Sequence, residues 1–501
     1  MYLNDDGMLR DSAAQFGVDA GRMRTRSPLW LDLDADGWLD LIITAAARPD
    51  TPPSLFRWDP AQAQYLQQPL AFLRASEVAN LSQLGQPGIQ HLITGPPHAL
   101  FVHEVREGEL VDVGAELALT DLPGHSVADL LIADLDNDLA LDLVYVRGFI
   151  APSVAQPEPD QLSARLQADM GRNALLRFHG PTQLSVQPYP LGRYWWGQGQ
   201  VFIGEAGASP PKMPAQLSAQ DPAVAGLATG EAGLFLGYDS ATNEWRVELR
   251  ATRWNSVNLE LQGDAPIQDL KVEGFDPKLR ALPQFVQWNS SDGFEPARAL
   301  NIEGDNCLAG ASGDFDNDMD IDLYLVCSDY LGNRTNILLE NLGNRRFRHI
   351  LAAGGAAGSD IGLGESVAVA DYDLDGFLDL FVRNGHELPP FANGPDQLFR
   401  NLGNANHWVQ MDLVGIQSNR NGIGARVVVT AGGVSQVRIV DNGSHGRVQD
   451  FRRLHVGLGP HQRIENVRIE WPSGTVTEHR NLHADRVWQF VENGAASALS
   501  F

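Results

Sequence analysis

The chain has 501 residues, with 63 acidic and 37 basic side chains, and its formal net charge is -26. This charge argues against nucleic acid as a partner, because phosphate binding needs clustered Lys and Arg. The apolar fraction of 43% is sufficient for a buried core, so the chain is not disordered throughout. No apolar run approaches the roughly 18 residues of a membrane-spanning helix, and we expect no membrane span.

The N-terminal sequence, Met1-Tyr-Leu-Asn-Asp-Asp-Gly7, has neither a basic head nor an apolar stretch, so it shows no signal peptide. Two locations therefore stay open. The protein is expected to be extracellular or periplasmic if a leader has been removed, and cytoplasmic otherwise.

One acidic motif occurs four times, with aspartates at positions one, three, five and nine of a nine-residue loop. A β-type apolar run follows every copy and precedes three of them, so the repeated unit is strand, acidic loop, strand. We name the copies loop 1 (32–40), loop 2 (134–142), loop 3 (314–322) and loop 4 (371–379). The shared aspartates are Asp32, Asp34, Asp36, Asp40, Asp134, Asp136, Asp138, Asp142, Asp314, Asp316, Asp318, Asp322, Asp371, Asp373, Asp375 and Asp379.

The spacing of the loops predicts the architecture. Their first aspartates are 102, 180 and 57 residues apart, which is two, three and one units of roughly 50 to 60 residues. We therefore predict an all-β fold, a seven-bladed β-propeller with acidic loops in units one, three, six and seven. A solenoid is the alternative, but a closed ring hides sheet edges better. The units without aspartates would contain Gly88–Ile93, Leu175–Gly204 and Gly230–Ser240.

Two segments, Asn336–Asn344 and Gln397–Asn404, are near copies of each other, but a strand-like run, Arg346–Ile350, follows only the first. The N-terminal segment Tyr2–Asp11 resembles the missing piece. We therefore predict that the N-terminus supplies the outer strand of the last blade and so closes the ring.

Two inserts interrupt the pattern. Residues 152–172 contain a predicted short helix, Asp160–Met170, with apolar residues at a spacing of four, and residues 209–222 are a predicted exposed loop. Beside that loop lies the densest aromatic cluster of the chain, which either packs in a blade or forms a stacking platform in a pocket. Its members are Tyr194, Trp195 and Trp196.

The two cysteines, Cys307 and Cys327, lie ten residues on either side of Asn317 in loop 3. If that loop turns a hairpin, the cysteines face each other across it. They are then either a cross-strand disulfide or two buried thiols.

The acidic loops have the ligand chemistry of a calcium site. Carboxylates at positions one, three, five and nine, with a backbone carbonyl near seven, supply the six or seven oxygens that Ca²⁺ prefers. Gly37 and Gly376 relieve the sharp turn at position six, whereas Leu139 and Met319 make it more strained in loops 2 and 3. Mg²⁺ demands stricter octahedral geometry, and zinc sites use His or Cys. We therefore predict about four Ca²⁺ sites, with the shared aspartates as ligands.

These loops resemble those of VCBS/FG-GAP repeat proteins, the integrin-α-type calcium propellers. Residues 405–491 resemble the ASPIC/UnbV domain in three motifs, Gly422-Ile-Gly-Ala-Arg-Val427, Leu454-His-Val-Gly-Leu-Gly459 and Val467-Arg-Ile-Glu-Trp-Pro472. The arrangement is similar to the cartilage-acidic-protein-1-like family, whose members range from matrix proteins to products of enediyne biosynthetic clusters. The resemblance implies a propeller over 1–404, an ASPIC/UnbV-like β domain over 405–493 and a tail over 494–501.

The chain carries no common signature of an enzyme: G-x-x-x-x-G-K-[ST], H-E-x-x-H and G-x-S-x-G are all absent. We therefore expect a calcium-stabilised binding or scaffold protein that presents loops to a protein, glycan or small-molecule partner. The alternative is a biosynthetic cyclase or transferase, with its pocket on the propeller axis or at the domain junction. The candidate catalytic residues for that alternative are Tyr194, Trp195, Trp196 and His445.

Overall fold

The computed structural model describes most of the chain between Tyr2 and Ser500. It leaves out residues 6–7, 20–24, 46–53, 71–77, 86–87, 96–99, 118, 120–126, 149–152, 169–172, 191–200, 253–254, 275–282, 301, 303–305, 328–334, 359–363, 386–394, 442 and 446–447. In the described part the only helices are two 3₁₀ turns, η1 (Pro222–Val224) and η3 (Leu351–Gly355). No helix there has the length and apolarity to cross a membrane. The all-β prediction is confirmed.

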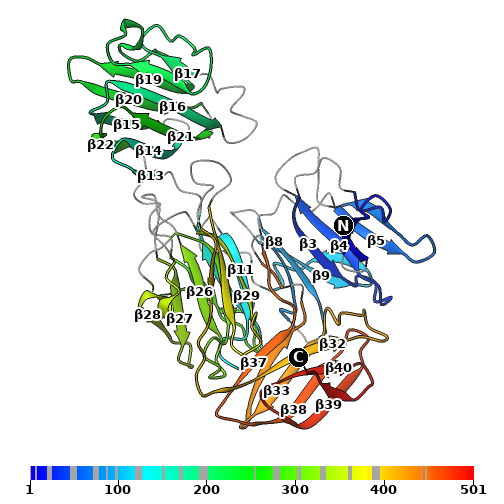
Figure 1. Cartoon of the computed structure of the whole chain (residues 1–501). Helices are drawn as coiled ribbons and strands as arrows, with labels where there is room; N and C mark the ends of the chain where they lie inside the picture. The colour runs from blue at the N-terminus through cyan, green and yellow to red at the C-terminus, as the bar shows by residue number, and fades with distance from the viewer. Residues whose placement is uncertain are drawn as a thin grey trace.

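Five blade-like sheets form the main body of the molecule (Figure 1). Blade 1 contains β3 (Thr25–Leu31), β4 (Asp40–Ala45), β5 (Ser54–Asp59) and β6 (Gln64–Pro69). Blade 2 contains β7 (Val78–Ser82), β8 (His91–Gly95), β9 (Phe101–Arg106) and β10 (Glu109–Asp112). Blade 3 contains β11 (Val127–Ala133), β12 (Asp142–Arg147), β23 (Phe285–Gln287) and β24 (Arg298–Ala299). Blade 4 contains β25 (Cys307–Gly313), β26 (Asp322–Cys327), β27 (Ile337–Asn341) and β28 (Phe347–Ile350). Blade 5 contains β29 (Gly364–Ala370), β30 (Asp379–Asn384) and β31 (Gln397–Phe399).

Neighbouring blades pack face to face through apolar cores. Because successive side chains of a strand point to opposite faces, Tyr145 of β12 lies in the core shared with blade 2, and Val144 lies in the core shared with blade 4. In the same way, Leu323 of β26 faces blade 3 and Tyr324 faces blade 5. Such cores join blades 1 to 5 in chain order, and in the described residues none joins blade 5 back to blade 1. The structure is propeller-like, and closure of the ring is not confirmed.

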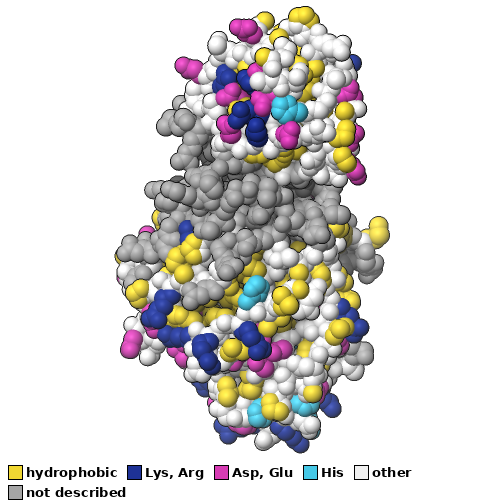
Figure 2. Space-filling model, turned by 90° about the vertical axis from the view of Figure 1, so that its left-hand side faces the viewer, with side chains coloured by type: hydrophobic (Ala, Val, Ile, Leu, Met, Phe, Trp, Pro, Cys, Tyr) yellow, Lys and Arg dark blue, Asp and Glu magenta, His cyan; other side chains and the backbone are white. Residues whose placement is uncertain are grey.

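The predicted count of seven blades is not confirmed either, because residues 153–274 form a separate β-sandwich inserted into blade 3. One of its sheets has the order β13-β14-β21-β16-β18, and the other has the order β17-β19-β20-β15-β22. The strands of the first sheet are Ser153–Ala155, Gln161–Ala168, Asn255–Gly263, Gln183–Pro190 and Ala215–Ser218. Those of the second are Val201–Ile203, Gly233–Asp239, Glu244–Arg250, Ala174–His179 and Gln268–Glu273. Figure 2 shows the sandwich as a lobe of its own, with charged side chains of both signs on the visible face.

Two interpretations of this region are therefore wrong. The segments Leu175–Gly204 and Gly230–Ser240 contribute strands to the sandwich and are not degenerate blades; only Gly88–Ile93, which includes the start of β8, lies in a blade. The predicted helix over Asp160–Met170 is strand β14, whose residues Leu162, Ala164, Leu166 and Ala168 are buried. Apolar residues four apart satisfy a strand of period two as well as a helix, and pairing with β21 selects the strand.

The predicted role of the N-terminus is also wrong. In the described residues, β1 (Tyr2–Asp5) and β2 (Met8–Asp11) pair only with each other, and β31 has no further neighbour. The chain then packs on blade 1, where Phe16 and Val18 belong to the same apolar cluster as Phe56, and the Tyr65 N–H donates to the Phe16 carbonyl at 2.8 Å. The N-terminal strands therefore form a hairpin of their own and do not add a strand to the last blade in the described residues.

The C-terminal domain packs two sheets around one apolar core. The first sheet has the order β37-β32-β40-β41 (Leu454–Gly459, His407–Val414, Arg486–Val491 and Ala496–Ala498). The second has the order β34-β33-β38-β39 (Val434–Ile439, Arg426–Ala431, Arg463–Glu470 and Val476–His483). Strand β41, from the segment expected to be a tail, forms an edge of the first sheet.

A short hairpin of the C-terminal domain, β35 (Ser444–His445) and β36 (Val448–Gln449), reaches the inner strands of the blades. β35 contacts β3, β7 and β11, while β36 contacts β29. The hairpin therefore occupies the axis around which the blades are arranged.

Cys307 and Cys327 form a disulfide between β25 and β26, where they are directly opposite in the strand register. Of the two alternatives for this pair, the structure has the cross-strand disulfide. Both residues are fully buried in the core between blades 3 and 4.

We predict that the sandwich unfolds independently of the blades. Trp245 is 1% exposed in its core and donates to the Pro181 carbonyl at 2.8 Å, so Trp245→Ala should destabilise the sandwich by about 3–5 kcal/mol. Hydrogen exchange measured peptide by peptide should show faster exchange in residues 153–274 and unchanged exchange in the blades. The control Trp288→Ala, in the core of blades 3 and 4, should show the opposite pattern. Equal loss of protection in both regions would contradict this independence.

Candidate metal centre

Each acidic loop joins the innermost strand of a blade to the next strand, and its first aspartate organises the turn. In all four loops, Oδ1 of this aspartate accepts the N–H of position five at 3.0–3.2 Å, and Oδ2 accepts the N–H of position six at 2.9–3.1 Å. These aspartates are at most 8% exposed. A buried carboxylate thus satisfies donors that the tight turn would otherwise leave unpaired.

The aspartate at position nine ties three parts of a blade together. Its Oδ2 accepts the N–H of position two at 2.9–3.2 Å. Its Oδ1 accepts an N–H at the end of the third strand at 2.7–2.9 Å. The hairpin and the strand beside it therefore share one buried carboxylate in every acidic blade.

Three asparagines extend this arrangement across the blades, and the sequence analysis did not assign them a role. The side-chain nitrogens of Asn289, Asn341 and Asn401 each donate to the position-eight carbonyl of their own loop and to a carbonyl in the preceding blade, at 2.7–3.2 Å. The repeated Asn-Leu-Gly sequence at Asn341 and Asn401 was the signal that could have identified two of them.

The backbone of the loops is left-handed at the same two positions. Position four has φ of 57–62° and position six has φ of 72–92° in all four copies. Glycine adopts the second conformation easily in loops 1 and 4, whereas Leu139 and Met319 adopt it against the preference of a side chain. The strained turns predicted for loops 2 and 3 are therefore present.

This scaffold gathers carboxylates into four groups. In loops 2, 3 and 4 the aspartates at positions one, three and nine converge, and in loop 1 those at positions one, three and five converge, with ligand oxygens within 4.8 Å of one another. Asp40, Asp138, Asp318 and Asp375 lie outside these groups. In all four loops, the aspartate at position five accepts the N–H of position seven at 2.8–3.0 Å.

The gathered carboxylates repel one another and are poorly solvated. Burial raises the pKa of Asp142 to about 8, with a smaller contribution from Asp136 and Asp134. Burial and then Asp314 and Asp316 raise the pKa of Asp322 to about 9. A cation at the centre of each group would offset this repulsion.

The donor set fits a hard cation. Every group consists of carboxylate oxygens without His or Cys, and Oδ1 of Asp136 is buried without a hydrogen-bond partner. Some negative charge is already compensated at the rim of the loops, since Arg345 contacts Asp136 at 2.7 Å and Arg400 contacts Asp375 at 3.2 Å. The arrangement can bind a divalent cation that prefers oxygen.

Of the four candidate catalytic residues, the structure describes His445 alone. Tyr194, Trp195 and Trp196 lie outside the described residues. His445 is 7% exposed, and its ring nitrogens lie 3.0 Å from Asp129 and 3.1 Å from Asp450. Burial alone would lower the pKa of His445, but the carboxylates of Asp450 and Asp129 raise it well above its ordinary value. The imidazolium therefore anchors the axial hairpin to β11.

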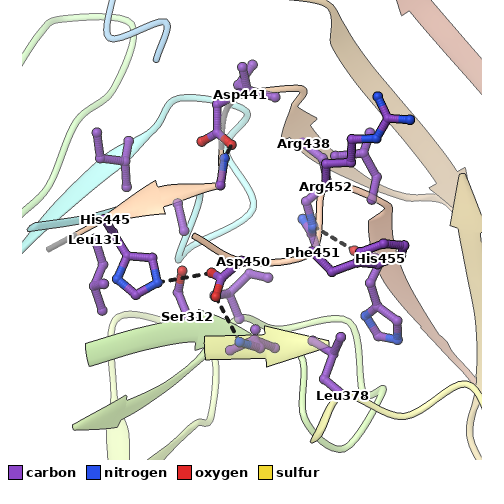
Figure 3. Close-up of a pocket in the computed structure, with 18 of the residues that line it drawn as sticks. Leu131, Ser312, Leu378, Arg438, Asp441, His445, Asp450, Phe451, Arg452 and His455 are labelled. Carbon is purple, nitrogen blue, oxygen red and sulfur yellow. Dashed lines mark hydrogen bonds and ion pairs between the residues drawn. The ribbon is translucent and has the colours of Figure 1, made fainter. Parts of the chain in front are cut away.

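A cavity of about 200 Å³ lies between the axial hairpin, the inner strands and the C-terminal domain. Figure 3 shows His445 and Asp450 on one side, with Arg438, Arg452 and His455 on the other. Asp450 accepts the N–H of Val369 in β29 at 2.8 Å, so both ends of the hairpin are fastened to inner strands. The cavity is smaller than the roughly 300–1,000 Å³ of typical ligand pockets.

Two segments of the chain match the models of known protein families. Residues 314–382, which contain loops 3 and 4, match the model of the FG-GAP-like repeat family. Residues 415–497 match the ASPIC and UnbV family model. The chain thus carries an FG-GAP-like repeat segment followed by an ASPIC/UnbV domain, as its sequence resemblance implied.

Curated proteins similar to this chain include cartilage acidic protein 1 of Xenopus tropicalis, 29% identical over 174 residues. The mouse and human proteins of the same name are each 28% identical, over 170 and 188 residues. These alignments cover 32–36% of the chain and about a quarter of each relative's length, 25–27%. Among solved structures, phage phi92 endosialidase aligns over 94% of this chain and 63% of its own, with 8% identity. Its TM-score of 0.18 is too low to support any argument.

We predict that the metal-free protein becomes less stable as the pH rises from 5 to 8.5. The folded pKa values of Asp32, Asp134, Asp142 and Asp322 are raised, so their contribution to stability is present below the unfolded pKa near 4 and is lost as the pH passes about 6 to 9. Added Ca²⁺ should reverse the loss most strongly at high pH, because ligands must be deprotonated. Thermal unfolding at three pH values checks this, and a stability of the metal-free protein that rises with pH would contradict it.

Proposed function

We propose that this protein is a calcium-stabilised binding or scaffold protein whose four acidic loops hold about four Ca²⁺ ions. The observation that carries the proposal is the fourfold repetition of one loop geometry, in which three carboxylates converge in each of the four acidic loops. Ca²⁺ takes six to eight oxygens at flexible positions, which suits carboxylates on a loop. The match to the FG-GAP-like repeat model supports the same proposal.

The position of the β35–β36 hairpin on the axis of the blades favours binding over catalysis. The β35–β36 hairpin occupies the place where a propeller enzyme would open its pocket, and both ring nitrogens of His445 are held by carboxylates. The alternative, a cyclase or transferase, would use a pocket at the domain junction, where the structure has the cavity of about 200 Å³. The partner would be a protein, glycan or small molecule bound on the loops or on the projecting sandwich.

The disulfide supports an extracellular or periplasmic location. Disulfides form and persist in oxidising compartments and are rare in the cytosol. The Cys307–Cys327 bond joins the two strands that flank loop 3, where it strengthens the hairpin that carries that loop.

Calcium removal should lower the melting temperature by many degrees. One site saturated at 100 times its dissociation constant contributes about 2.7 kcal/mol, so several sites together exceed ordinary mutational effects. Asp36→Ala and Asp375→Ala should each reproduce part of the loss, because each removes a carboxylate from one loop. Calorimetry with and without a chelator measures this, with elemental analysis for the bound metal. A melting temperature unaffected by chelation would contradict the proposal.

A further inference from the structure

The C-terminal domain lies against the ends of the blades that carry the acidic loops (Figure 1). Blade 2, which has no acidic loop, contacts the domain at the equivalent place, where Gln83 Nε2 donates to the Gly424 carbonyl at 2.7 Å. The domain therefore covers the loop end of the main body.

Loops 3 and 4 bind this domain through their turn positions. The Gly459 N–H donates to the Asn317 carbonyl at 2.8 Å, and His455 Nε2 lies 3.0 Å from the Gly376 carbonyl. Gln410 Nε2 donates to Asp371 at 2.5 Å. The C-terminal domain thus contacts positions four, six and one of these loops. Positions four and six have the left-handed backbone, and position one is the first aspartate.

The packing at these contacts leaves no spare room. A Cβ added to Gly457 would lie 2.0 Å from Oδ2 of Asp314 and 2.6 Å from Cα of Asn317. Met319, at position six of loop 3, belongs to the apolar core of the C-terminal domain. A small movement of loop 3 would therefore break several contacts at once.

Loop 2 is joined to the domain by the Arg426 side chain, which donates to the Leu139 carbonyl at 3.1 Å. Arg438 of the domain, which is partly buried, also interacts electrostatically with Asp134 of loop 2 and Asp314 of loop 3. In the described residues, loop 1 has no hydrogen bond to the domain, although a Cβ added to Gly37 would lie 3.0 Å from the Gln417 carbonyl.

The three loops are also linked in series by asparagine at position four. Asn137 donates to the Met319 carbonyl at 3.2 Å and to Asp320 at 2.7 Å, and Asn317 donates to the Gly376 carbonyl at 3.1 Å. The two bonds to backbone carbonyls run from position four of one loop to position six of the next. Loops 1 and 4 have Ala35 and Leu374 at position four and cannot make such a bond.

We propose that loops 2, 3 and 4 form a metal-dependent docking platform for the C-terminal domain, so that loss of the cations releases the domain from the blades. This rests on the proposed function, because it requires those loops to bind a cation. Without the cation the gathered carboxylates repel one another, and the backbone positions that contact the domain are those whose conformation the loop must hold against strain.

The test compares the full chain with Ca²⁺ and after chelation, by hydrogen exchange and small-angle scattering. Chelation should speed exchange at least tenfold at the Gly459 amide and raise the radius of gyration. Amides between β33 and β38 should stay protected, which separates release of the domain from its unfolding. Unchanged exchange at Gly459 and an unchanged radius would overturn the inference.

Calcium binding is measured in parallel by titration calorimetry with CaCl₂. Absence of binding up to millimolar Ca²⁺ would overturn the proposed function and, with it, the inference. Binding without any effect of chelation on docking would overturn only the inference.

Matched variants locate the platform. Asp373→Ala in loop 4 should release the domain in Ca²⁺, whereas Asp34→Ala at the same position of loop 1 should not, although both aspartates belong to the converging groups; release by both or by neither counts against the platform. Gly457→Ala should release the domain while loops 1, 2 and 4 still bind Ca²⁺, and Gly114→Ala, which meets only ordinary contacts, is its control. If Gly457→Ala fails to fold, the comparison of the native chain with and without Ca²⁺ still tests whether docking of the domain depends on the metal.

Discussion

The burial of aspartate at both ends of each acidic loop is the constraint on which the rest of the structure depends. The carboxylates at positions one and nine accept four backbone N–H groups per loop and are almost inaccessible to water. They shape the turn and fasten the third strand, but they also bring negative charges together in a medium that solvates them poorly. A structure built this way is held together locally by hydrogen bonds and strained by electrostatic repulsion.

This conflict connects the cations that we propose for the loops with the C-terminal domain that covers them. Asn289, Asn341 and Asn401 use the loop carbonyls to join successive blades, and the C-terminal domain uses other carbonyls of the same loops as its acceptors. The conformation of the loops therefore affects the contacts between successive blades and also the contacts with the C-terminal domain. The axial hairpin, anchored by His445 between Asp129 and Asp450, adds a second connection.

The sequence was most informative where a motif repeats and least informative where it does not. The hairpin around each loop, the facing cysteines and the C-terminal β domain followed from local pattern, because the residues that decide them are close in sequence or belong to a recognisable motif. That all sixteen aspartates are metal ligands stays a prediction, and the structure places them in different surroundings. Position one and position nine are buried and hold backbone, whereas position five caps a turn outside the converging groups in loops 2 to 4.

The sequence by itself determined that the chain is all-β, that four loops gather carboxylates and that Cys307 can face Cys327, since each depends on alternation or spacing within a few tens of residues. Only the tertiary structure decided that the 171 residues between loops 2 and 3 hold a sandwich and not further blades, because β14 pairs with β21 across about ninety residues of chain. It also decided that residues 2–11 pair with themselves and that the loops face the C-terminal domain. Strand pairing and domain contact between distant segments depend on which surfaces meet, and no local pattern specifies that.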